Sequence, residues 1–93
     1  MIDTTYLRDR TSDILKSLRH SGVLTDEELK DCAEFAFGIA TAKSAREVEN
    51  YTRSLATMKS VALLRATRES EKALMEIAWT ALDILAKVVL AAI

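Results

Sequence analysis

The sequence predicts an all-α protein, an antiparallel bundle of three or four helices, from three observations. The 93 residues contain no proline and only two glycines, so little in the chain interrupts a helix. Alanine, leucine, lysine, arginine and glutamate dominate the composition, and all of them favour helix. Apolar residues recur every three or four positions, as they do on one face of a packed helix. A chain of this length is expected to form one domain, residues 1–93.

The first helix is predicted over residues 4–20. Asp3 or Thr4 can cap its start. Gly22, which has no side chain, can take the left-handed conformation that ends a helix. One face of this helix is expected to join the core through five residues: Leu7, Thr11, Ile14, Leu15 and Leu18.

The second helix is predicted over residues 26–43. Thr25 and Glu28 form a capping box, in which each side chain bonds the backbone N–H of the other residue. Phe35 and Ile39 lie off the main apolar stripe, so we expect them to meet a second neighbour. The main stripe holds several small residues that allow close helix packing: Leu29, Cys32, Ala33, Ala36, Phe37 and Ala40.

The third helix is predicted over residues 44–66, with Ser44 and Glu47 as a second capping box. No glycine or proline separates it from the second helix. One continuous helix over residues 26–66 is therefore an alternative. The apolar stripe continues almost in phase through this region: Val48, Tyr51, Leu55, Met58 and Ala62.

The last helix is predicted over residues 70–92, after a break between Ala66 and Lys72. A straight helix through this region would put the polar residues of 73–93 on the face that Tyr51 and Leu55 occupy. One core cannot lie on both sides of a straight helix. We therefore expect the last helix to fold back, although no strong helix breaker marks the turn.

Residues 73–93 have far more apolar surface than one neighbour can bury. The four polar residues Glu76, Thr80, Asp83 and Lys87 fall in a strip about 60° wide, and the remaining arc of about 300° is apolar. A helix on one side of a bundle needs an apolar face of only about 100° or somewhat more. This segment is therefore a central helix, an oligomer interface or a membrane helix. Charges near its middle cost about 2.5–3.5 kcal/mol each on insertion, so we expect no membrane contact.

The favoured interpretation is a subunit interface. A chain of 93 residues forms a marginal core, and oligomerisation is a common remedy. A homodimer through the last helix is the simplest arrangement, although Trp79 can instead fill the core within one chain. The predicted interface residues are Trp79, Leu82, Leu85, Val89, Leu90 and Ile93.

The chain has few residues suited to catalysis or metal binding. His20 is the only histidine, and no nucleophile or orienting carboxylate is spaced to work with it. Cys32 is the only cysteine, and its place on an apolar face predicts buried packing. We therefore expect neither an enzyme nor a bound metal or cofactor. Four carboxylates of the second helix are expected to form a solvated acidic face: Glu27, Glu28, Asp31 and Glu34.

A nucleic-acid-binding regulator is the alternative function. Residues 43–72 are locally basic, and in one continuous helix most of the basic residues would lie in an arc of about 120° that could follow a phosphate backbone. Glu47 and Glu71 share this arc, and the net charge of the chain is −1. The candidate contacts are Lys43, Arg46, Arg53, Arg65, Arg68 and Lys72.

The sequence favours a small non-enzymatic interaction protein, an adaptor, regulator or inhibitor that acts through helix surfaces. Its partners are expected to be a second copy of itself and a further protein. The single cysteine and the polar first residues, Met1 to Arg10, favour the cytoplasm.

Overall fold

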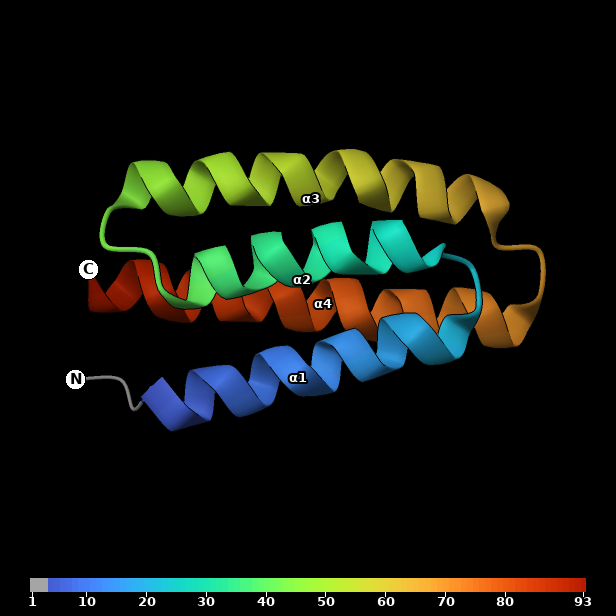
Figure 1. The fold of residues 1–93 in the computed structure, drawn as a ribbon, viewed down its shortest axis with the longest axis horizontal. Helices are drawn as coiled ribbons and strands as arrows, with labels where there is room; N and C mark the ends of the chain where they lie inside the picture. The colour runs from blue at the N-terminus through green and yellow to red at the C-terminus, as the bar shows by residue number, and fades with distance from the viewer. Residues whose placement is uncertain (1–3) are drawn as a thin grey trace.

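A computed structural model describes residues 4–93 as four α-helices with three short connections (Figure 1). The helices run in alternating directions, so α4 ends at the end of the bundle where α1 begins. The predicted all-α bundle is confirmed, with four helices. Their bounds are α1 Thr4–Ser21, α2 Asp26–Ala40, α3 Ala45–Arg65 and α4 Glu69–Ala92.

The helices form an elongated bundle, 39 × 22 × 20 Å, in which α2 and α4 contact each other across the centre. Each of these two also contacts both α1 and α3. Within residues 4–93, α1 and α3 have no contact with each other. Consequently α4 packs against three helices, which accounts for most of its large apolar arc.

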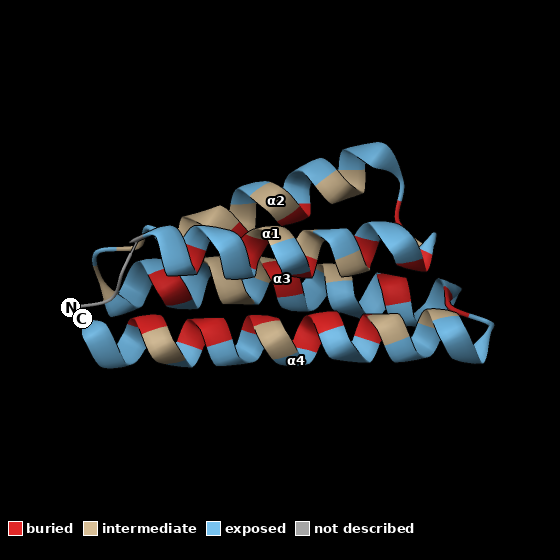
Figure 2. Ribbon diagram, turned by 90° about the horizontal axis from the view of Figure 1, so that it is seen from below, coloured by how far each residue is buried: buried red, intermediate tan, exposed pale blue. Residues whose placement is uncertain are grey.

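The core contains the predicted apolar faces of the helices (Figure 2). Ile39, which was expected to meet a second neighbour off the main stripe, lies in the core and is only 1% exposed. The reason is that α2 contacts α4 as well as α1 and α3. The other buried core residues of the first three helices are Leu7, Ile14, Leu18, Cys32, Ala36, Val48, Leu55 and Ala62.

Local hydrogen bonds define the turn from α1 to α2. The Ser21 hydroxyl donates to the carbonyl of Leu18, and Gly22 adopts the predicted left-handed conformation, with φ +71°. At Thr25 both bonds of the predicted capping box form, 2.9 Å and 3.2 Å long. At the other end of α1, Thr4 is its first residue rather than its cap, and Asp3 lies outside the described residues.

The alternative of one helix over residues 26–66 is wrong, because α2 ends at Ala40 and α3 begins at Ala45. The Ser44 hydroxyl caps α3 by accepting a hydrogen bond from the N–H of Glu47, 3.2 Å. The carboxylate of Glu47 accepts from the N–H of Lys43, 3.1 Å, one residue before the predicted partner. Two residues with polar side chains therefore replace the missing glycine or proline.

The predicted break before the last helix is confirmed at residues 66–68. Arg68 stands at the N-cap position of α4 but has no acceptor in its side chain. The Glu71 carboxylate instead accepts hydrogen bonds from the N–H groups of Arg68, 2.8 Å, and Thr67, 3.1 Å. This turn separates the apolar face of α3 from that of α4, as the conflict in helical phase required.

Candidate docking surface

The side of α4 that faces away from α2 is exposed and carries two parallel strips. The polar strip, Glu76, Thr80, Asp83 and Lys87, is exposed as predicted. Beside it lies an apolar strip whose two largest members are Ile77 and Ile84. Their exposed fractions are 60% and 56%. We define the apolar strip of α4 as Ala73, Ile77, Ala81, Ile84, Val88 and Ala91.

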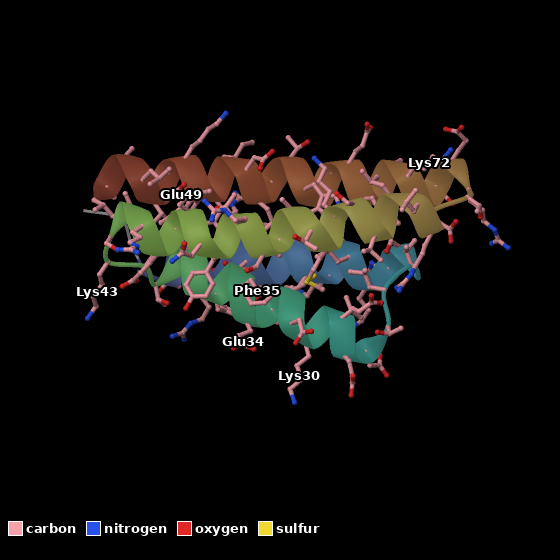
Figure 3. All side chains as sticks on the ribbon, turned by 90° about the horizontal axis from the view of Figure 1, so that it is seen from above. Lys30, Glu34, Phe35, Lys43, Glu49 and Lys72 are labelled. Atoms are coloured by element: carbon pink, nitrogen blue, oxygen red, sulfur yellow. The ribbon has the colours of Figure 1, made fainter. Side chains whose placement is uncertain are left out.

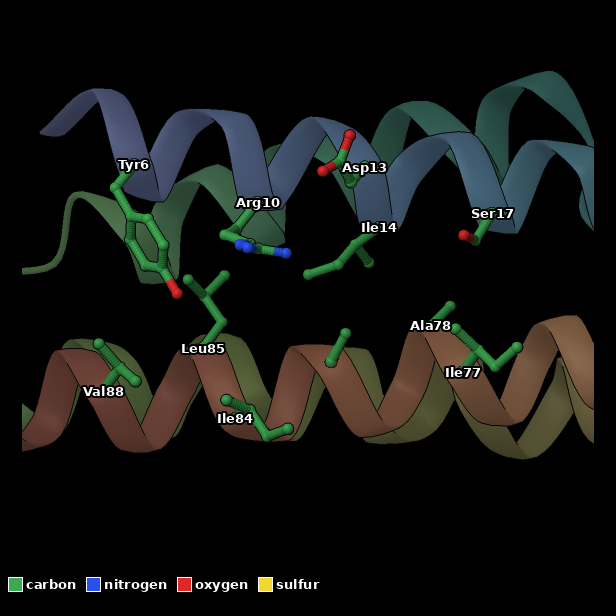
Figure 4. A pocket seen from close by; sticks show the side chains of 11 residues that line it. Tyr6, Arg10, Asp13, Ile14, Ser17, Ile77, Ala78, Ile84, Leu85 and Val88 are labelled. Atoms are coloured by element: carbon green, nitrogen blue, oxygen red, sulfur yellow. The ribbon is translucent and has the colours of Figure 1, made fainter.

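A groove of about 290 Å³ runs between α1 and α4 along the edge of the apolar strip (Figure 4). Ile14, Ala78 and Leu85 lie at its base, and all three are buried in the bundle. Ile77 and Ile84 belong to its α4 side. The groove is therefore a largely apolar channel between two antiparallel helices.

The α1 side of the groove is polar. Its exposed side chains follow one another at helical spacing along α1, and the first of them, Tyr6, is 48% exposed. The Arg10 guanidinium lies over the Tyr6 ring, 5.3 Å from its centroid. An apolar base with a polar rim is the usual arrangement of a protein interface. The α1 residues of this rim are Tyr6, Arg10, Asp13 and Ser17.

A second, wider groove follows the other side of α4, toward α3. Lys59 and Leu63 line it from α3, and Glu76 and Thr80 line it from the polar strip. Ile77, Ala81 and Ile84 border both grooves. The apolar strip of α4 is thus a ridge between two grooves, a shape that can insert between side chains of a partner.

Four of the six predicted interface residues are buried inside the chain. Trp79, Leu82, Leu85 and Val89 are each only 4% exposed, because they face α1, α2 or α3. The alternative that Trp79 fills the core of one chain is therefore confirmed. Leu90 and Ile93 are exposed, 43% and 54%. The prediction of a subunit interface on α4 stays a prediction, with its accessible residues on the neighbouring face.

The sequence did not single out Ile77 and Ile84, although both lie in the apolar arc of the last helix. Periodicity gave an arc of about 300° without showing which part of it meets another helix. The exposed part became visible only when the positions of α1 and α3 were known. A usable signal was present, since Ile77 and Ile84 are seven residues apart, at the spacing of one helix seam.

The candidate nucleic-acid residues are not gathered on one helix. Lys43 lies at one end of the bundle, and Lys72 lies at the other end of a molecule 39 Å long (Figure 3). Arg46 is in the first turn of α3, three residues after Lys43. The connection at residues 66–68 splits the predicted arc. Two of the basic side chains are paired, Arg53 with Glu49 at 3.2 Å and Arg65 with Glu28. The remaining candidate, Arg68, lies in the connection itself.

The other candidate groups occupy ordinary structural positions. His20 is exposed in the last turn of α1, and Cys32 is buried as predicted. The acidic face of α2 is largely exposed, and Lys30 and Glu34 project from it away from the bundle (Figure 3). Residues 4–93 contain no group of three or more His, Cys, Asp or Glu side chains that could hold a metal ion. In the same range, no helix is both long enough and apolar enough to cross a membrane.

Comparison with known proteins gives no match to a family model, to a curated protein or to a solved structure.

Proposed function

We propose that this chain is a protein-interaction module without enzymatic activity, an adaptor, regulator or inhibitor. Its docking surface is the apolar strip of α4 together with the groove between α1 and α4. The observation that carries the proposal is the exposure of Ile77 and Ile84 beside an apolar groove. Full burial of an exposed isoleucine side chain contributes about 1.5–3 kcal/mol. A partner gains somewhat more than half of that from Ile77 and from Ile84, because they are 60% and 56% exposed.

The shape of the surface suits a helical partner. An amphipathic helix that lies in a groove places apolar residues at intervals of three and four positions against it. The groove between α1 and α4 has these two helices as its sides and an apolar base, so it can accept such a partner helix. The polar rim residues, such as Arg10 and Asp13, can then discriminate between partners by charge.

Comparative co-purification from the native host tests the proposal. The tagged protein is expected to retain at least one protein, either an unlike protein or untagged copies of itself. The variant Ile84→Asp is expected to lose that protein, because it puts an unpaired charge into the docking surface. Binding of the retained protein is then measured with purified components.

Leu64→Asp is the matched control. Leu64 is 87% exposed on α3 and lines neither of the two grooves beside the apolar strip, so the same chemical change there leaves the docking surface intact. Circular dichroism checks that both variants remain helical. If Ile84→Asp and Leu64→Asp retain the same proteins with the same affinity, the proposed docking surface is wrong.

A further inference from the structure

We infer that the apolar strip of α4 is covered by a second copy of this chain, with the two α4 helices packed antiparallel about a two-fold axis. This inference rests on the proposed function and names the partner of that surface. Two observations carry it: the spacing of residues along the strip, and the charges that border it.

The strip is self-complementary in the antiparallel direction. With the two-fold axis beside Thr80 and Ala81, Ile77 lies opposite the partner's Ile84, and Ala73 lies opposite the partner's Val88. The two residues nearest the axis are small, so the helices can approach closely there. Because the axis repeats each contact, both isoleucines of both copies are covered at once.

The charges of the polar strip also match in this direction. Glu76 and Lys87 lie on the same side of the ridge, on opposite sides of the axis and at similar distances from it. The two-fold operation brings Glu76 of each copy toward Lys87 of the other. A parallel arrangement does not form these pairs, because it turns the polar strip of one copy toward the α1 edge of the other. Asp83 belongs to the same strip but lies about 40° farther round the helix from the ridge than Lys87, so its repulsion of the partner's Glu76 is weaker than this attraction. The pairs of Glu76 with Lys87 therefore favour the antiparallel dimer.

The contact is small, so the dimer is expected to be of moderate affinity. It consists mainly of one pair of helices, at the low end of the size range of specific interfaces. Sedimentation velocity over a concentration series is expected to give monomers at about 1 μM and dimers at about 100 μM. Ile84→Asp is expected to weaken the association about 100-fold or more, and Leu64→Asp is expected to leave it unchanged.

Disulfide crosslinking tests the direction of packing. In the antiparallel dimer an equimolar mixture of the I77C and I84C variants is expected to form the mixed disulfide. Either variant alone is expected to remain uncrosslinked, because its two introduced thiols are separated by about 10 Å along the helices. The native Cys32 does not interfere, since it is buried. Efficient crosslinking of I77C alone contradicts the antiparallel arrangement.

The outcomes separate this inference from the proposed function. A protein that stays monomeric at the highest concentration, or a dimer that Leu64→Asp dissociates and Ile84→Asp does not, overturns the inference. In the monomeric case the proposed function still stands or fails on whether Ile84→Asp removes an unlike partner. A dimer that Ile84→Asp dissociates and the mixed disulfide traps supports both.

Discussion

At the scale of single residues, Gly38 shows how one side chain determines the approach of two helices. A Cβ atom added to Gly38 would lie 2.6–2.8 Å from three atoms of the Tyr51 ring. Such distances are far shorter than ordinary van der Waals contacts. The Tyr51 ring also packs at a tilt against Phe35, with 6.3 Å between ring centroids. Gly38 therefore admits the ring of Tyr51 between α2 and α3, a role that the sequence did not reveal.

This contact predicts strong coupling between Gly38 and Tyr51. Alanine favours helix over glycine by about 1 kcal/mol, so Gly38→Ala in a Tyr51→Ala background is expected to increase the free energy of unfolding by about that amount. In the Tyr51 protein the added methyl group meets the ring, and overpacking of this kind costs about 1–3 kcal/mol. Chemical denaturation of the four proteins measures the coupling. If Gly38→Ala increased the free energy of unfolding equally in the two backgrounds, the Tyr51 ring would be free to move away from the added methyl group.

The thiol of Cys32 is expected to be unreactive until the chain unfolds. Burial, and then the nearby charges of Asp31 and Glu28, raise the pKa of Cys32 to about 11, and its Sγ atom lies 3.6 Å from the sulfur of Met58. At pH 8 we expect a disulfide reagent to label it only at the rate of unfolding, and rapidly in denaturant. A cysteine introduced at the exposed residue Ser60 is the control and should react at once. Fast labelling of native Cys32 would contradict its burial.

At the scale of helices, α2, α3 and α4 begin with the same kind of hydrogen bond. A glutamate in the first turn, Glu28, Glu47 or Glu71, accepts a hydrogen bond from a backbone N–H that precedes the helix. The backbone N–H of Thr25 and then Arg65 lower the pKa of Glu28. The backbone N–H groups of Arg68 and then Thr67 lower the pKa of Glu71. These carboxylates allow sharp turns in a chain that has no proline.

The lowered pKa values predict loss of stability in acid. A carboxyl group whose pKa is lower in the folded protein stabilises the fold fully above its unfolded pKa, and this contribution is lost as the pH falls through the folded value. The midpoint temperature of thermal unfolding is therefore expected to decrease as the pH falls below about 4.5, the ordinary pKa of glutamate. Glu71→Gln is expected to reduce that dependence on pH.

The control for Glu71 is Glu69→Gln, which removes the same charge from the same helical turn. Glu69 does not accept the two hydrogen bonds that connect Glu71 to Thr67 and Arg68. The pH dependence of unfolding of the Glu69→Gln variant is therefore expected to stay close to that of the parent protein. Equal effects of the two substitutions would mean that the charge of the turn matters and the hydrogen bonds do not.

The helices themselves were largely predictable from the sequence, because each signal was local. The capping box at Thr25 and the apolar stripe of α3 are properties of neighbouring residues, and the structure confirms both predictions. The break before α4 came from a conflict in helical phase. The end of α2 was ambiguous, because Ser44 and Glu47 fit both a new helix start and the exposed face of a continuous helix. Only packing against the other helices decides between these two.

At the scale of the whole molecule, the candidate docking surface was less predictable than the helices. The position of α1 and α3 on either side of α4 decides which part of the apolar arc remains exposed. Those positions depend on packing between segments far apart in the sequence, such as α1 and α4, which contribute Ile14 and Leu85 to the base of one groove. Leu82 and Ile84, close neighbours on one apolar helix, therefore have opposite surroundings.

Leu82 and Ile84 provide the last prediction, which separates the core of one chain from the contact between copies. Leu82→Ala is expected to lower the free energy of unfolding by about 2–5 kcal/mol at every protein concentration, because Leu82 is 4% exposed within the chain. Ile84→Ala is expected to change it by less than about 0.5 kcal/mol at low concentration, since Ile84 is 56% exposed.

Protein concentration is the decisive variable for this pair. Dimerisation adds to the apparent stability only when the dimer is populated. The parent protein and Leu82→Ala should therefore both gain stability as the concentration rises, provided that Leu82→Ala remains folded. Ile84→Ala should gain much less. Denaturation curves at low and high concentration measure these differences. If the stability of Ile84→Ala rises with concentration as steeply as that of the parent, the contact between copies lies elsewhere on the molecule.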